Sequence, residues 1–318
     1  RTEKDYARIM EDLLALLIKM ENALGGDGNS ITFHYPDGSY KIVKEHRQSH
    51  RLFSRFEELK NALKGAVSVQ MHARLSTCGS SEHHENMHPF VHGNIIGCHN
   101  GQIDDVYLWD LLDIKPYSTT DSEAIFAHLS VHAPTLHPKQ VQTTLDHLYG
   151  SYALTVVSKA KPRQLFIIAQ NNPLCYYYDR KHQELWFAST DDLLPETLNI
   201  PVKQEKHTIK GKTYTRTVSL VRELKKGEGV YFRSHKKGVS IEHIDFEVKD
   251  QPKHAFPYAW SAYDYAYDYE EVTKEQALIA FKNGQDILLA FDNGKDYYAL
   301  DTSDIENHEG SFLIEYVY

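Results

Sequence analysis

Residues 72–79 read HARLSTCG, a predicted strand that delivers an arginine and then two hydroxyl side chains into a glycine turn. Three further motifs follow in order: NMHPF at 86–90, HNG at 99–101 and TDSE at 120–123. The HNG motif comes at the end of a predicted apolar strand, and TDSE opens a predicted helix. Each motif alone is weak, but four of them in this order form a specific pattern.

The segments around these motifs predict helices on the outside of two layers of strands. Before residue 72, the periodicity indicates a helix that is capped by Thr2 and Asp5 and stopped by Gly25. After residue 123, helices are expected first and short strands follow. The predicted helices are 2–24, 49–63, 104–112, 122–131 and 138–148. The predicted strands are 31–35, 40–44, 66–75, 95–98, 152–157, 165–169, 175–178 and 185–188, with hairpins between 202 and 246.

A change of composition near Gln251 predicts a boundary between parts of the chain. Six tyrosine and tryptophan residues interleaved with aspartates occupy 256–269, which indicates either a docking linker or an aromatic edge strand on the main domain. The expected organisation is a main domain at 1–248, a tyrosine-rich linker at 249–272 and a small appendage at 273–318. The appendage is predicted to contain a helix, a hairpin and a final strand, and it is too small to hold a stable core unaided.

Composition excludes several classes of function. The chain has 318 residues, of which 41% are hydrophobic, and it contains no apolar run long enough to cross a bilayer, so no membrane partner is expected. A net charge of −9 argues against nucleic-acid binding through phosphate neutralisation. Three scattered cysteines do not form a disulfide framework, and this favours a reducing cytoplasm.

Together, the four motifs resemble the class II glutamine amidotransferase domain of the N-terminal-nucleophile hydrolases. The resemblance covers roughly residues 1–245 and extends to GSYA at 150–153 and NPL at 172–174. It implies an α+β fold, an αββα four-layer sandwich of two sheets between helical layers, here with a small C-terminal α/β appendage. The implied activity is hydrolysis of glutamine to glutamate and ammonia, without a cofactor. No acceptor domain is recognised in this sequence, so the ammonia acceptor is expected on a separate enzyme or subunit.

Amide hydrolysis needs donors for the oxyanion of a tetrahedral intermediate. The carboxamide of Asn100 and the backbone N–H of Gly101 suit this role, and the resemblance implies it for both residues. Loss of one such donor typically costs about 3 kcal/mol, or roughly a hundredfold in rate. The alternative for this pair is an ordinary Asn-Gly turn at the end of a strand.

A free amino acid also requires a cation for its carboxylate and an anion for its ammonium group. Arg74 can bind the carboxylate through a two-pronged fork, and the resemblance assigns the ammonium to Asp121. The alternatives are a surface ion pair for Arg74 and an N-cap for Asp121. Thr77 and Gly79 are expected to line the same pocket, and His88 is expected to stabilise its wall.

The histidines at 84, 88 and 92 stand at four-residue steps, a spacing that on a helix would suit a metal. Pro89 opposes a continuous helix there, so no metal site is expected.

The cysteine nucleophile of such domains is missing from these 318 residues, because the chain begins at Arg1 and enters its first helix almost at once. Two explanations stay open. Either an N-terminal cysteine lies a few residues upstream of Arg1, with its α-amine as the base, or the domain is a non-catalytic binding or assembly module. Cys78, Cys98 and Cys175 are expected to be inert thiols.

Overall fold

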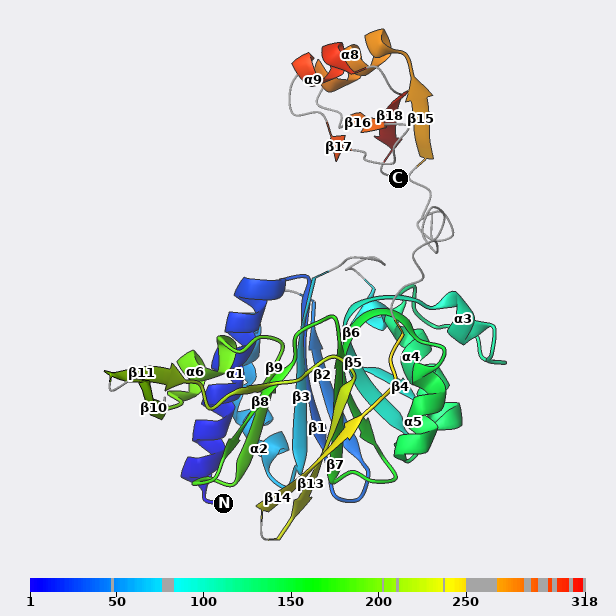
Figure 1. Ribbon diagram of the computed structural model, residues 1–318. Coiled ribbons are helices and arrows are strands. Elements are labelled where there is room, and N and C mark those ends of the chain that lie inside the picture. The colour runs from blue at the N-terminus through cyan, green and yellow to red at the C-terminus, as the bar shows by residue number, and fades with distance from the viewer. Residues whose placement is uncertain are drawn as a thin grey trace. The chain divides into compact units, whose positions relative to one another are not determined.

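The computed structural model (Figure 1) begins with helix α1 (Glu3–Leu24), whose start follows from its sequence. The hydroxyl of Thr2 accepts a hydrogen bond from the backbone N–H of Asp5, and the carboxylate of Asp5 accepts one from the N–H of Thr2. This capping box satisfies backbone donors that the first turn would otherwise leave unpaired. The apolar side chains that recur at three- and four-residue steps along this helix are buried at Ile9, Met10, Leu13, Leu17 and Met20, and Leu17 is 0% exposed.

The structure describes residues 1–46, 49–75, 83–201, 203–209, 212–236, 238–249, 268–282, 287–290, 297–298, 302–308 and 311–316. The chain divides into two compact units, Arg1–Pro252 and Lys253–Tyr318.

Two small antiparallel sheets pack under α1 in the first unit. One has the order β2-β1-β3, with β1 at Gly28–His34, β2 at Tyr40–Glu45 and β3 at Ser68–Arg74. The other has the order β12-β8-β9, with β8 at Cys175–Asp179, β9 at Glu184–Ala188 and β12 at Arg222–Glu223. A single apolar cluster joins α1 to both sheets and to α6 (Leu193–Leu198). The segment predicted as one helix at 49–63 is a 3₁₀ helix, η1 (Ser49–Arg55), followed by α2 (Phe56–Leu63).

A six-stranded antiparallel sheet forms the second half of this unit, in the order β14-β13-β7-β6-β5-β4. Helices α4 (Ser122–His132) and α5 (Pro138–Leu145) cover one of its faces, and β8 packs on the other (Figure 1). The strands are β4 (Phe90–His92), β5 (Ile95–Asp104), β6 (Tyr149–Ser158), β7 (Gln164–Gln170), β13 (Glu228–His235) and β14 (Gly238–Asp245).

Three details of the first unit differ from or add to the sequence prediction. The HNG motif does not end its strand, because β5 continues to Asp104 and pairs with β6 along its whole length. Helix α3 is shorter than predicted and covers only Val106–Trp109. The remaining elements are the 3₁₀ turn η2 (His84–Asn86) and a separate hairpin of β10 (Lys203–Ile209) and β11 (Lys212–Val218).

In the described part of the second unit there are a four-stranded sheet, in the order β15-β18-β16-β17, and two helices. A small apolar cluster of Ala277, Ala280, Ile305 and Phe312 lies between them. The elements are β15 (Asp268–Val272), α8 (Lys274–Lys282), β16 (Ile287–Ala290), β17 (Tyr297–Tyr298), α9 (Thr302–Asn307) and β18 (Ser311–Tyr316). Most of the predicted linker at 249–272 lies outside the described residues, while its last five residues form β15. Among the helices described in both units, none is long and apolar enough to span a bilayer.

Candidate active site

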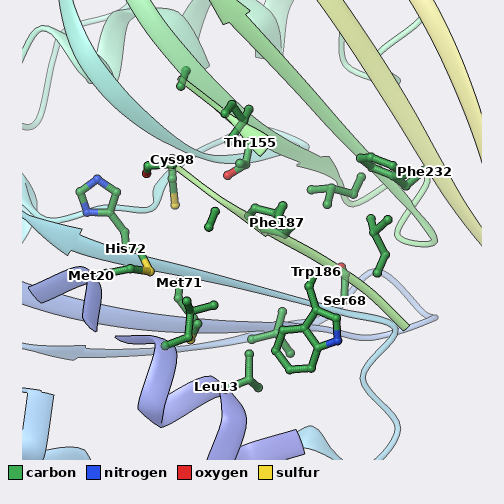
Figure 2. Close-up of a pocket in the computed structure, with 18 of the residues that line it drawn as sticks. Leu13, Met20, Ser68, Met71, His72, Cys98, Thr155, Trp186, Phe187 and Phe232 are labelled. Carbon is green, nitrogen blue, oxygen red and sulfur yellow. The ribbon is translucent and has the colours of Figure 1, made fainter. Parts of the chain in front are cut away.

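A cavity of about 1100 Å³ runs through the interior of the first unit. Helix α1, strands β3 and β9 of the two small sheets, and the six-stranded sheet all line this cavity, and their side chains point into one space (Figure 2). These include Leu13 and Met20 of α1, Met71 and His72 of β3, Trp186 and Phe187 of β9, and Cys98, Thr155 and Phe232 of the six-stranded sheet.

The cavity separates the edges of the two small sheets. Among the described strands, β3 pairs only with β1, and β9 pairs only with β8. All residues of β9, and all of β3 except Gln70, line the cavity. Two strand edges therefore border the same cavity, and a strand edge is a template for pairing with another extended segment.

The predicted site residues in the described part of the chain meet at this cavity. Arg74, His88, Asn100, Gly101 and Asp121 all line it. Arg74 is only 5% exposed, so the alternative of a surface ion pair does not describe it. Thr77 and Gly79 lie outside the described residues.

Gly101 has a backbone conformation that requires glycine. Its φ is +140°, and a Cβ built there would lie 2.0 Å from the carbonyl oxygen of Ser151. The same strand position brings Asn100 opposite Ala153 on β6. The motif glycine thus permits a close backbone approach within a strand, so the alternative of an ordinary Asn-Gly turn does not describe it.

Asp121 occupies the N-cap position of α4, yet its side chain makes no capping hydrogen bond. Instead, Oδ2 accepts a hydrogen bond from the backbone N–H of Ile103 at 2.9 Å, and Oδ1 accepts one from the hydroxyl of Ser122 at 3.2 Å. These bonds hold the carboxylate against β5, at the wall of the cavity.

Three buried histidines support the same wall. The rings of His72 and His88 lie 4.0 Å apart, and Nε2 of His72 lies 3.2 Å from the carbonyl oxygen of His99. Burial lowers the pKa of His72 to about 4, and it lowers the pKa of His88 well below the ordinary value. Burial also lowers the pKa of His99. All three rings are therefore neutral at neutral pH, which leaves Arg74 as the cation among the site residues of this wall.

Lys44 and Asn172 also bear on the site, and the sequence prediction gave neither of them a role. Lys44 donates to the carbonyl oxygens of His84 at 3.2 Å and Met87 at 2.5 Å, so it ties β2 to the segment that carries His88. Asn172 donates from Nδ2 to the carbonyl oxygen of Asn100 at 2.7 Å. Its place in the NPL motif was the signal available in the sequence, whereas nothing local marks Lys44.

The histidines at 84, 88 and 92 do not converge. The ring of His84 packs against His46, that of His88 against His72, and Nε2 of His92 lies 3.0 Å from a carboxylate oxygen of Glu123. Over the described parts of the chain, no three ligating side chains are placed to hold a metal ion.

Both described cysteines have the properties of inert thiols. Burial raises the pKa of Cys98 to about 12 and that of Cys175 to about 12. The thiol of Cys175 also donates to the carbonyl oxygens of Ala188 and Thr190, at 3.3 and 3.1 Å. A thiol that is protonated at neutral pH is a poor nucleophile. Cys78 lies outside the described residues.

Comparison with known proteins agrees with the motifs. Residues 72–196 match the sequence profile of a glutamine amidotransferase domain. A 7-cyano-7-deazaguanine synthase of Saccharolobus solfataricus is 26% identical over 195 residues, which are 59% of this chain and 41% of that protein. A glutamine–fructose-6-phosphate aminotransferase of Buchnera aphidicola is 26% identical over 209 residues, which are 61% of this chain and 33% of that protein. The chain thus spans less than half of the length of these relatives.

The fold has a counterpart among solved structures. The glutamine phosphoribosylpyrophosphate amidotransferase of B. subtilis superposes with a TM-score of 0.50 at 16% identity, over 76% of this chain and 47% of that chain. At this identity the likeness concerns the fold alone. Profile, relatives and fold together confirm the predicted resemblance to class II glutamine amidotransferases and the mixed α and β fold of N-terminal-nucleophile hydrolase type.

Proposed function

The chain carries a glutamine amidotransferase domain, and from this premise we propose that it hydrolyses the side-chain amide of glutamine to glutamate and ammonia. The observation that carries the proposal is the meeting of Arg74, Asp121 and the Asn100–Gly101 pair at one cavity. These groups provide what glutamine hydrolysis requires: a cation for the carboxylate, an anion for the ammonium group and hydrogen-bond donors for the oxyanion.

In this proposal, the charged ends of glutamine fix its orientation. Arg74 binds the α-carboxylate, and Asp121 binds the α-ammonium group. Asp121 is suited to this because the N–H of Ile103 and the hydroxyl of Ser122 already hold its carboxylate in place. Such preorganisation limits the entropy lost when the substrate binds. His88 belongs to the surrounding wall.

The reaction requires a nucleophile, which we propose is an N-terminal cysteine upstream of Arg1. Its α-amine accepts the thiol proton, and the sulfur forms a bond to the amide carbon. The side-chain N–H of Asn100 and the backbone N–H of Gly101 stabilise the oxyanion. The protonated α-amine gives its proton to the amide nitrogen, the C–N bond breaks and ammonia leaves. Water then hydrolyses the thioester, which releases glutamate and restores the thiol.

The geometry of α1 and β3 supports this position for the nucleophile. Near the start of α1, Glu3 forms an ion pair with Lys64, which precedes β3, at 2.6 Å. Beyond the end of α1, the N–H of Asp27 donates to the carbonyl oxygen of Arg74 at 3.0 Å. The helix therefore runs along β3 in the same direction, and Arg1 lies at the end of the cavity away from Arg74.

A strand that ends at Arg1 and runs antiparallel to β3 would begin beside Arg74. It would lie between the open edges of β3 and β9 and join the two small sheets into one. Because β3 covers this span from Ser68 to Arg74, the cysteine is expected about seven residues before Arg1, at a rise of about 3.3 Å per residue.

Calorimetric titration with glutamine tests the binding site, using protein that carries its native N-terminus. Arg74→Ala removes the cation, while Asp121→Asn keeps an acceptor for Ile103 and removes only the charge. Each is expected to weaken glutamine binding at least tenfold, because a buried charge of the substrate loses its partner. Undiminished binding in both variants would reject the site assignment.

A further inference from the structure

The side chain of Asn172 is bonded to the peptide that is central to the proposed reaction. It follows β7 in the chain, and its Nδ2 donates to the carbonyl oxygen of Asn100 at 2.7 Å. This carbonyl belongs to the peptide unit that links Asn100 to Gly101. A Cβ built on Gly101 would lie 2.6 Å from the same Nδ2, so the amide group of Asn172 rests directly on Gly101.

A restraint on this carbonyl is also a restraint on the Gly101 N–H. The peptide unit is planar and trans, so its C=O and N–H point in opposite directions. A bond that fixes the direction of one therefore fixes the direction of the other. It also polarises the peptide, which strengthens the N–H as a donor.

The restraint matters because Gly101 restricts its own backbone conformation very little. Without a Cβ, glycine populates positive and negative φ about equally, and the peptide before it can reorient at low cost. At φ +140°, Gly101 holds a conformation that only a few residues adopt, and its neighbours must maintain it.

We infer that Asn172 is a positioning residue for the oxyanion hole: its side chain orients the Asn100–Gly101 peptide so that the Gly101 N–H is presented to the developing oxyanion. The inference rests on the proposed function for its chemical consequence. Asn172 acts through this peptide and does not itself react.

Steady-state kinetics of ammonia release by two variants tests whether Asn172 contributes to stabilisation of the oxyanion. Asn172→Ala is expected to lower kcat about tenfold and to leave KM within about twofold, because an oxyanion exists only after the substrate is bound. Asn172→Asp keeps the shape of the side chain but has no donor at neutral pH, so its loss is expected to equal or exceed that of Asn172→Ala. Asn171→Asp introduces the same charge one residue away and is the control.

Three kinetic outcomes would overturn the inference. Full activity of Asn172→Asp would show that only the shape of the side chain matters. A rise in KM alone would indicate a contact with the substrate in place of a positioning role. An equal loss in Asn171→Asp would assign the effect to charge.

An NMR measurement that does not depend on turnover tests this inference independently of the proposed function. The residual dipolar coupling of the Gly101 N–H, measured by NMR, reports the orientation of that bond. It is expected to change in Asn172→Ala and to stay unchanged in Asn171→Asp. An unchanged coupling in Asn172→Ala would overturn the inference even in an active enzyme. Absence of glutaminase activity in the unsubstituted protein would instead reject the proposed function.

Discussion

The backbone N–H of His99 donates a hydrogen bond to Nδ1 of His88 at 3.3 Å, so the imidazole of the NMHPF motif holds the strand that carries the HNG motif. His88 is 5% exposed, and its ring also packs against His72 and Phe90. Two motifs that are separate in sequence are thus one structural unit at the wall of the cavity.

Removal of this imidazole should destabilise the first unit. His88→Ala leaves the His99 N–H buried without its partner, at an expected cost of about 1–3 kcal/mol in the free energy of unfolding. His88→Asn places an amide oxygen near the position of Nδ1 and should recover at least half of that loss. Urea denaturation at neutral pH measures both, and an equal loss in the two variants would show that the hydrogen bond contributes little.

Two glycines with positive φ form a matched pair for testing the close approach at the site. A Cβ at Gly101 would meet the Ser151 oxygen at 2.0 Å, whereas one at Gly65 (φ +83°) would have no heavy atom within 4 Å. Gly65→Ala should therefore cost only the backbone strain of about 1–2 kcal/mol. Gly101→Ala should cost roughly 1–3 kcal/mol more, because the strand must shift. Thermal unfolding compares them, and equal melting temperatures would contradict this account of Gly101.

The buried histidines predict a loss of stability in mild acid. Burial lowers the pKa of His34, His72 and His128 to about 4 in the folded protein, from an ordinary value of 6.5. Below about pH 6.5 the unfolded chain takes up protons that the folded chain does not. The stability that neutral histidines provide is therefore complete above pH 6.5 and is lost as the pH falls toward 4.

Each such histidine contributes a slope of up to about 1.4 kcal/mol per pH unit in this window. Urea unfolding between pH 6.5 and 5 measures the slope, and His34→Asn should reduce it by the share of one histidine. A free energy of unfolding that stays constant over this range would contradict the prediction.

The second unit is expected to be dispensable for folding of the first, since the chain divides at Pro252. A fragment of residues 1–252 should unfold cooperatively, with a urea midpoint close to that of the full chain. Cutting at 272 instead would leave β15 without its partner β18. Insolubility of the 1–252 fragment, or a broad transition, would show that the two units share a core.

Local signals in the sequence were sufficient for much of the fold. The capping pair of Thr2 and Asp5 sets the start of α1, and the Pro36-Asp37-Gly38 turn sets the hairpin of β1 and β2. Both depend on interactions between residues close in the chain, which is why periodicity and turn chemistry predict them.

The remaining features depend on contacts between distant segments. The Asn-Gly pair at 100–101 is predicted at the end of its strand, with a turn as the alternative, but pairing with Ala153 and Tyr152 keeps it inside β5. The bond from Asn172 spans 72 positions in sequence, and the cavity is formed by elements from α1 to β14. The order of the motifs predicted which residues meet, whereas the open edges of β3 and β9 became apparent only in three dimensions.

Covalent labelling of the native N-terminus tests the central claim most directly. Protein that carries its encoded N-terminus is treated with a diazo-ketone analogue of glutamine, which alkylates a reactive thiol, and the adduct is located by mass spectrometry of the peptides. We predict one adduct, on a cysteine about seven residues before Arg1 as estimated from the rise of a strand, together with loss of ammonia release from glutamine. Asn100→Ala should slow both labelling and turnover. A native N-terminus without such a cysteine, or an unlabelled protein that releases no ammonia, would contradict the enzymatic account and leave a non-catalytic module in its place.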